Sequence, residues 1–393
     1  MSTIGEDEKS IIESNNLFAM DLYFRLARED GNIFFSPYSI LTALFMVYAG
    51  ARKNTAVQME RALRIMFQQD RLHRVFRQFS SQFDVSEDYE LSVANALSTG
   101  NDRYILDSYK DFIRNVYGGE FLEFSASHIN NWVSKKTHGH IKEIIDPSSF
   151  GTTLLVLLNA VYFKGVWQFQ FKKNKTSDSD FFLPSGKTVQ VPMMHQVAFF
   201  PYDENPSMQI LEMIYRGKIR DISMVVFLPK ERNGLHRFEE SISAKMLQKN
   251  MRNLRKREVE VFLPRFRIEA GYRLDDAFKD MGMVDAFTTD ADFSGMTDNP
   301  DGLMFEKILH KATIDVDEKG TVAAAVTAMM MTLGSYQPPP VFRADHPFLF
   351  VLRDVNTGII LFIGKMSDPV ESYKKSSSSQ PFIKGLVRRL WRS

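Results

Sequence analysis

The most unusual stretch of this sequence is EKGTVAAAVTAMMMTLGSYQPPP, residues 318–340. After its first two residues it carries no charge, and the next charged residue along the chain is Arg343. Alanine and methionine are good helix formers, whereas Val322, Val326 and Thr327 are β-branched and favour a strand. The stretch alone therefore fits a helix or a buried strand, and its meaning depends on the segments around it.

Composition places the chain among ordinary globular proteins. It has 393 residues, of which 44% are hydrophobic and 25% charged, with a net charge of +1. Length alone suggests two or three domains, but no linker interrupts the apolar runs. We therefore expect one domain over 1–369 and a separate extension over 370–393. The charge balance gives no indication of nucleic-acid binding, and we expect a monomer.

Cysteine is absent, which excludes disulfides, thiolate metal sites and cysteine nucleophiles. The polar, acidic N-terminus MSTIGEDEKS lacks the pattern of a signal peptide. The longest apolar run, 154–163, is too short to span a bilayer and predicts a buried strand. The sequence leaves two locations open: export or surface attachment by an unconventional route, which we favour, and the cytoplasm.

Helical patterns dominate the first part of the chain. Apolar spacing predicts a helix over 11–28, a strand followed by a helix from Ser36-Pro37 over 33–49, and further helices within 55–83 and 126–145. Strand-like runs follow at 156–163, 187–194, 224–229 and 258–268. Residues 346–364 predict a β-hairpin around an Asn-Thr-Gly turn. This order predicts an α+β protein with antiparallel or mixed sheets.

Catalytic and metal-binding patterns are weak. No GxSxG, GxGxxG, phosphate-binding loop or HExxH motif occurs. His138 and His140 lack a third ligand for zinc. Asp290 and Asp292 resemble the start of a calcium loop, but Asp301 stands where a bidentate Glu is needed. We therefore expect a turn here with Phe293 packed inward, no metal, and no enzyme activity.

The segments around the opening stretch resemble the serpin family. FRADHPFLFVL (342–352) resembles the family's signature strand, and KILHKATIDVDEKGT (307–321) resembles the strand and hinge before the reactive-centre loop. NIFFSPYSI (32–40), LLNAVYFKGVWQFQF (157–171), VPMM (191–194), FLPRF (262–266) and ADFSGM (291–296) follow in the family's order. The resemblance covers about 10–369 and is closest to serpins without a signal peptide, such as those of parasitic flatworms. It implies the serpin fold, with a large central sheet, smaller sheets and eight or nine helices.

The resemblance also implies suicide inhibition of a serine protease. The protease cleaves the exposed loop, about 318–341, and the cut loop inserts into the central sheet before the acyl-enzyme can be hydrolysed. The hinge that begins this insertion matches Glu318, Lys319, Gly320, Thr321, Ala323, Ala324 and Ala325. An inserted strand tolerates neither proline nor unpaired charge, and neither occurs from Gly320 to Gln337. The alternative is a non-inhibitory serpin with a carrier, chaperone or storage role.

The cleaved bond is less well defined. Counting about fourteen residues from Gly320 places it at Gly334-Ser335, whereas counting back from His346-Pro347 places it near Tyr336. Leu333 or Tyr336 as the specificity residue predicts a chymotrypsin- or elastase-like target. A cut at Arg343 by a trypsin-like protease is the other reading.

Further residues carry over from the family. Ser36, Ser39, Asn159 and His310 match the polar cluster where the sheet opens, and Trp167 matches the point of first insertion. Arginines recur where some relatives bind heparin. We expect no cofactor other than a sulfated glycosaminoglycan effector, for which the candidates are Arg71, Arg74, Arg77, Arg255, Lys256 and Arg257.

The extension ends in PFIKGLVRRLWRS, in which one helical face gathers the large apolar residues and the other the basic ones. This is an interfacial amphipathic pattern. Residues 380–393 are expected either to bind a membrane surface or to dock on the body of the protein.

Overall fold

The computed structural model describes residues 5–80, 89–100, 104–146, 155–217, 221–299, 303–319 and 338–370. Within these ranges the chain is a mixed α+β protein built from two sheets and nine α-helices. The helices are α1 (Glu6–Leu26), α2 (Pro37–Gly50), α3 (Lys53–Ala62), α4 (Gln69–Ser80), α5 (Asp107–Tyr117), α6 (Ala126–Lys136), α7 (Leu235–Ser241), α8 (Ala244–Asn253) and α9 (Asp275–Asp280). None of these helices combines the length and the apolar character needed to cross a bilayer.

The smaller sheet has five strands in the order β10-β11-β4-β2-β3. Its strands are β2 (Tyr89–Ser98), β3 (Glu120–Leu122), β4 (Leu155–Gly165), β10 (Phe266–Arg273) and β11 (Phe305–Val316). The central neighbours β4 and β11 run parallel, whereas β10 pairs with β11 and β2 with β4 in antiparallel fashion. Two long parallel strands therefore meet side by side in the middle of the sheet.

The larger sheet follows the path β1-β14-β13-β8-β7-β6-β9-β12, with β5 beside β6. Its strands are β1 (Ile33–Phe35), β5 (Ser177–Phe182), β6 (Thr188–Glu204), β7 (Met208–Ile214), β8 (Ile222–Pro229), β9 (Arg255–Pro264), β12 (Val341–Arg343), β13 (Phe348–Asp354) and β14 (Ile360–Met366). Every residue of β8, β13 and β14 is buried. The predicted hairpin at 346–364 is thus the centre of the core of this sheet.

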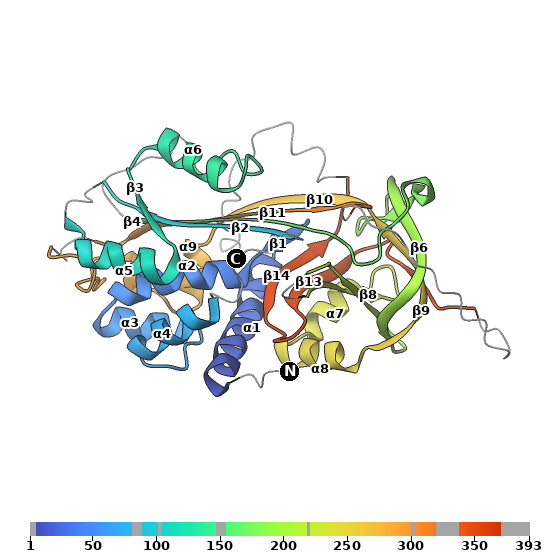
Figure 1. Ribbon diagram of the computed structural model, residues 1–393, viewed down its shortest axis with the longest axis horizontal. Coiled ribbons are helices and arrows are strands. Elements are labelled where there is room, and N and C mark those ends of the chain that lie inside the picture. The colour runs from blue at the N-terminus through green and yellow to red at the C-terminus, as the bar shows by residue number, and fades with distance from the viewer. Residues whose placement is uncertain are drawn as a thin grey trace, which may run out of the picture.

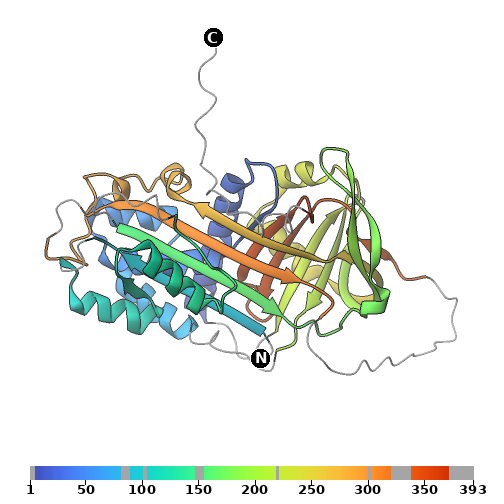
Figure 2. The ribbon, with the colours of Figure 1, turned by 90° about the horizontal axis from the view of Figure 1, so that it is seen from above.

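The two faces of the five-stranded sheet are covered differently (Figure 1). The helices α2, α3, α4 and α5 lie on one side, with α2 directly against the sheet. α6 lies on the other side, where a second apolar core joins it to β2, β4 and β11. Figure 2 shows the five-stranded sheet from above, with α6 in front of it and the larger sheet at one end.

Local sequence signals explain most element boundaries. Ser36 caps α2, since its hydroxyl accepts a hydrogen bond from the Ser39 backbone N–H at 3.1 Å, and Pro37 occupies the first turn. The predicted helix within 126–145 ends earlier, at Lys136, because His138 and Gly139 take positive φ angles of 49° and 79°. The predicted pattern over 55–83 forms two helices, α3 and α4, instead of one.

Candidate functional site

A buried polar cluster lies at the centre of the β4–β11 pair. Asn159 in β4 and His310 in β11 are in register, and both are almost fully buried. The Asn159 amide donates to the Ser39 hydroxyl at 2.6 Å and to the Asn95 side chain on β2. The Ser36 hydroxyl donates to the Leu361 carbonyl at 2.7 Å. One cluster thereby links the five-stranded sheet, the start of α2 and the buried strand β14.

The protonation state of His310 follows from its neighbours. Its Nε2 accepts from the Ser36 backbone N–H at 3.3 Å, so the ring proton resides on Nδ1 and is donated to the Asn159 side-chain oxygen. Burial lowers the pKa of His310 to about 3. The imidazole is therefore neutral at physiological pH, and its separation from Asn159 would break a hydrogen bond and leave no charge behind.

Trp167 lies near the end of β11 from which the chain enters the opening stretch. Its indole N–H donates to the Asp317 carbonyl at 2.9 Å, and its ring stacks on Tyr215 with centroids 4.1 Å apart. Trp167 does not join the polar cluster around His310. The hydrogen bond holds Asp317, the last residue before the predicted hinge.

The first residue of the predicted hinge, Glu318, is held by two contacts. Its carboxylate accepts a hydrogen bond from the Thr176 hydroxyl at 2.7 Å and forms an ion pair with Arg265 at 3.5 Å. Burial acts to raise the pKa of this carboxyl, but Thr176 and the nearby cations Arg265 and Lys173 lower it overall. Glu318 lines a groove of about 410 Å³ with these three residues and others.

The remainder of the predicted hinge and the predicted cleavage region fall outside the described residues. These are Gly320, Thr321, Ala323, Ala324, Ala325, Leu333, Gly334, Ser335 and Tyr336. Lys319 is described, and its backbone N–H donates to Asp317 at 2.7 Å.

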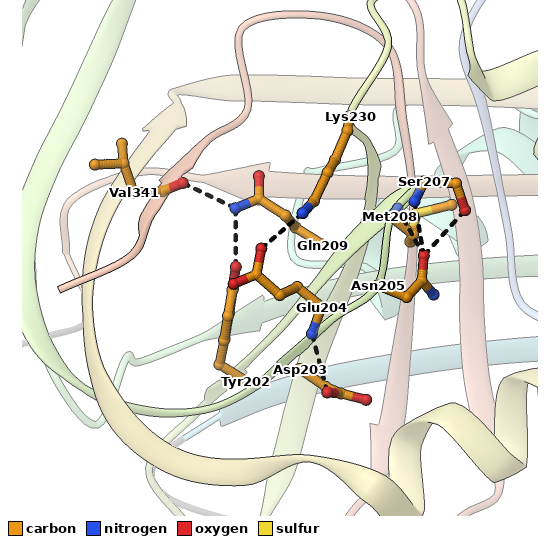
Figure 3. Close-up of polar contacts among 9 residues, drawn as sticks. All are labelled: Tyr202, Asp203, Glu204, Asn205, Ser207, Met208, Gln209, Lys230 and Val341. Carbon is orange, nitrogen blue, oxygen red and sulfur yellow. Dashed lines mark hydrogen bonds and ion pairs between the residues drawn. The ribbon is translucent and has the colours of Figure 1, made fainter.

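The far end of the loop is anchored on the larger sheet. Val341 in β12 pairs with Glu260 in β9, and the Gln209 amide donates to both the Val341 carbonyl and the Tyr202 hydroxyl at 2.9 Å (Figure 3). Gln209 lies in β7, three strands from β12 along the sheet, so the sheet curls back on itself here. Asn205 caps the adjoining turn by accepting from the Met208 backbone N–H at 3.0 Å (Figure 3).

The segment that follows α6 attaches this helix to the face of the five-stranded sheet that it covers. The ring of His140 stacks on Tyr162 in β4 with centroids 3.6 Å apart. Lys311 in β11 donates to the Glu143 carbonyl at 2.8 Å. His138 pairs with Glu90 in β2 at 2.7 Å. The segment after α6 is therefore attached to three neighbouring strands, so a wider separation of β4 and β11 would strain these contacts.

The remaining sequence candidates are also placed. Phe293 is fully buried, as expected, and Asp292 accepts from Ser294 and pairs with Lys53 at 2.9 Å, which forms a turn. Within the described ranges no three metal-ligating side chains converge. Arg71, Arg74 and Arg77 lie on the exposed face of α4, and Arg71 pairs with Asp7 at 2.6 Å. Arg255, Lys256 and Arg257 are exposed at the start of β9, in a different part of the molecule (Figure 1).

Sequence reasoning missed three residues of this site: Asn95, Arg265 and Gln209. Asn95 carried a usable signal, since an amide inside the small apolar run SVANALS needs a buried partner. Arg265 and Gln209 are brought to Glu318 and Val341 only by the tertiary fold.

The five-stranded sheet has a central parallel pair of strands with a buried polar cluster between them, and residues 317–340 connect it to the larger sheet. Both the sequence and the fold of this chain are similar to those of known proteins. The family model Serpin (serine protease inhibitor) matches residues 13–369. The chain belongs to the serpin family, which is described as a family of serine protease inhibitors and not of enzymes.

Three similar proteins illustrate the range of the family. An uncharacterized serpin-like protein of Thermococcus kodakarensis is 40% identical, with 92% of this chain and 86% of that protein covered. The leukocyte elastase inhibitor of Bos taurus is 37% identical, with 91% and 98% covered. The structure of human thyroxine-binding globulin complexed with thyroxine is 32% identical, with a TM-score of 0.81 and 91% and 98% covered.

Proposed function

We propose that this serpin inhibits a serine protease by inserting its cleaved loop between β4 and β11. The observation that carries the proposal is the parallel pairing of these two strands, with the chain leaving the end of β11 at Glu318. A segment that turned back from this point would run antiparallel to both neighbours. Insertion would thus replace one parallel ladder with two antiparallel ladders, which is strand addition of the kind established for serpin loops.

The length of the loop suits this insertion. β4 and β11 have 11 and 12 residues, and a strand of that length starting at Gly320 ends near Met331. Cleavage within 333–336 would therefore free enough chain to fill the space between them. Each added backbone hydrogen bond contributes roughly 0.5–1.5 kcal/mol, so one additional ladder releases on the order of 10 kcal/mol.

The polar cluster supports the proposal because it can part without leaving a buried charge. Neutral His310 keeps its contact with Ser36, and Asn159 keeps Ser39 and Asn95, when the bond between them breaks. Distortion of a trapped protease would then slow deacylation, since loss of one oxyanion donor alone costs roughly 10²–10³ in rate.

The target we propose is a chymotrypsin- or elastase-like protease that recognises Leu333 or Tyr336. The similarity to leukocyte elastase inhibitor supports this class. Similarity to thyroxine-binding globulin favours the alternative, a carrier without inhibitory activity. Thr321 and the three alanines after Val322 argue against the carrier, since small side chains are those that a closing sheet accommodates.

A panel of chymotrypsin, pancreatic elastase and trypsin tests the proposal. We expect a complex with chymotrypsin or elastase that survives SDS, and the N-terminal sequence of the C-terminal fragment locates the cleaved bond. Thr321→Arg should convert the inhibitor into a substrate, because a charge at the first buried position opposes insertion. Thr321→Ser is the matched control. An undiminished yield of complex from Thr321→Arg would contradict the insertion mechanism.

We further propose α4 as the site of a sulfated glycosaminoglycan effector. Arg74 and Arg77 are exposed on the same face as Arg71, and they are the charges to remove. Arg74→Ala/Arg77→Ala should elute from heparin at lower salt than Arg255→Ala/Lys256→Ala. If Arg255→Ala/Lys256→Ala elutes at the lower salt concentration instead, the effector binds at β9.

A further inference from the structure

Ser177 is an exposed serine close to the residue at which the predicted hinge begins. It is the first residue of β5 and follows Thr176, whose hydroxyl donates to Glu318 at 2.7 Å. Ser177 also lines the groove that contains Glu318, Arg265 and Lys173. A hydroxyl that can be phosphorylated therefore shares a groove with the contacts that hold Glu318.

The sequence that follows Ser177 is typical of the substrates of acidophilic serine kinases. Residues 177–180 read SDSD, so acidic side chains stand at the first and third positions after Ser177. Kinases select their substrates in part by such charge patterns. A motif this short also occurs by chance, so the fold decides whether it can be used.

The fold presents this segment in an accessible form. Among the described strands β5 pairs only with β6, so its other edge is not covered by a strand. Ser177, Asp178 and Asp180 are exposed, whereas Ser179 is half-buried. A kinase that binds its substrate as an extended segment can therefore reach Ser177 without unfolding the protein.

The charges that line the groove are balanced before any modification. Lys173 and Arg265 are positive, and Asp178 and Glu318 are negative. The Glu318 side chain is 5% exposed, but its ion pair with Arg265 is long, at 3.5 Å. The Arg265 side chain is 42% exposed, so part of its guanidinium is accessible to a second anion.

A phosphate on Ser177 would change this balance. It carries a charge of about −1.5 to −2 at pH 7 and can accept two parallel hydrogen bonds from an arginine. A groove of about 410 Å³ is about 9 Å across if it is treated as a sphere, which is similar to the distance of about 8–10 Å over which salt screens charges. The phosphate would therefore attract Arg265 and Lys173 and repel the Glu318 carboxylate.

We propose that Ser177 is a phosphorylation site for an acidophilic serine kinase, and that its phosphate releases Glu318 by pairing with Arg265 and Lys173. The Ser177 hydroxyl oxygen forms a bond to the γ-phosphorus of a nucleoside triphosphate, and the bond from that phosphorus to the bridging oxygen breaks. The nucleoside diphosphate leaves, and the hydroxyl proton passes to the catalytic carboxylate of the kinase. The modification and the release of Glu318 do not depend on the proposed inhibition.

The first test is incubation of the native full chain with casein kinase II and ATP. Mass spectrometry of the tryptic peptide 176–187 should find phosphate on Ser177. Ser177→Ala should lose this phosphate, and the matched control Ser179→Ala should keep it. A synthetic peptide of residues 170–187 is treated in parallel. Phosphate on this peptide but not on the native protein would mean that the fold hides Ser177, and phosphate on neither would mean that the motif is not a substrate; both results would overturn the proposal.

Calorimetry of the phosphorylated protein tests the release of Glu318. Phosphate should lower the melting temperature of wild type by about 1–2 °C and should leave that of Glu318→Gln almost unchanged, because a neutral amide is not repelled. Ser177→Asp should reproduce part of the fall in unmodified protein. Its matched control is Ser185→Asp, which adds the same charge at the exposed turn between β5 and β6, outside the groove, and should have no effect. An equal fall in wild type and Glu318→Gln would mean that the phosphate does not act on Glu318.

Mixing the same samples with chymotrypsin separates this proposal from the proposed function. Phosphate on Ser177 with the shift that depends on Glu318, but no covalent complex from any sample, would support the phosphorylation site and remove inhibition. A covalent complex from protein whose Ser177 cannot be phosphorylated by the kinase would support inhibition and overturn the phosphorylation site.

Discussion

His310 in β11 donates a hydrogen bond from Nδ1 to the side-chain oxygen of Asn159, its register partner in β4. Both residues are buried, and the bond crosses the pair of strands that we propose to separate. Because the buried imidazole is neutral, the stability of the folded state depends on pH.

The first prediction concerns this coupling. Burial lowers the pKa of His310 to about 3 and that of His73 in α4 to about 4. In the unfolded chain an imidazole takes up a proton below about pH 6.5. Stability is therefore fully present above about pH 6.5 and falls as the pH decreases toward the two folded-state values. At pH 5 each histidine should reduce the free energy of unfolding by about 2 kcal/mol.

Urea unfolding at pH 7.5 and pH 5 measures this effect. His310→Gln should be less stable than wild type at pH 7.5 and should lose about 2 kcal/mol less on acidification. His236→Gln is the control, because the His236 side chain is 85% exposed. An unchanged pH dependence in His310→Gln would mean that the imidazole is not buried and neutral in the folded state.

A second prediction concerns the contact between Glu318 and Arg265. Glu318→Gln should lower stability only slightly, by less than about 1 kcal/mol, because Arg265 is 42% exposed and solvent screens the pair. Glu318→Lys should destabilise the protein further, since the new lysine would lie beside two other cations, Arg265 and Lys173.

Charge exchange provides the control for this contact. Arg265→Glu added to Glu318→Lys should recover part of the lost stability, measured as the midpoint of urea unfolding. If the loss of stability in the double variant equals the sum of the losses in Glu318→Lys and Arg265→Glu, the ion pair contributes nothing to the stability of this region.

The third prediction is that a cut within 333–336 raises the melting temperature sharply. The new strand would add a ladder of backbone hydrogen bonds and bury apolar side chains. Intact and cleaved protein are compared by calorimetry in the same buffer, with Thr321→Arg cleaved in parallel as a control. Identical midpoints for the intact and cleaved wild type would favour a non-inhibitory serpin with a fixed sheet.

The fourth prediction concerns residues 380–393, which we expect to bind anionic bilayers as a helix lying flat. Six large apolar residues share one face, and each contributes roughly 1.5–3 kcal/mol when fully buried. Four basic residues add roughly 1 kcal/mol each near an anionic surface. Ordering a short peptide opposes this, so binding should be moderate and reversible.

Co-sedimentation with phosphatidylserine vesicles at low salt compares the full chain with a form ending at Pro369. Only the full chain should sediment, and neutral vesicles should retain less of it. If both forms stay in solution, the tail docks on the body of the protein instead.

The sequence predicted features that depend on short-range patterns. Ser36-Pro37 marked the start of α2, and the turn after Asp354 marked the hairpin of β13 and β14, because capping and turn chemistry are local. The serpin fold itself followed from several motifs in a fixed order.

Features that depend on distant contacts escaped prediction. The strand β2 was missed, although Asn95 within it completes the polar cluster, because its small residues favour no single period. The helix before His138 was drawn too long, since nothing in the spacing signals two successive left-handed residues. Gln209 could not be connected with Val341, because 132 residues separate them and only the curl of the sheet brings them together.

The burial of β13 and β14 determines what a cleaved molecule is. Both strands follow the loop in sequence, and every residue of both is buried within the larger sheet, so we expect a cut within 333–336 to sever the backbone without releasing either fragment. The cleaved product would consist of two associated chains. It would migrate as one species under native conditions and as two bands on a denaturing gel. Residues 371–393 belong to the smaller fragment, whereas a protease acylated by the proposed mechanism would be bonded to the larger one. Only the contacts between the two fragments would then connect that protease to whatever the tail binds.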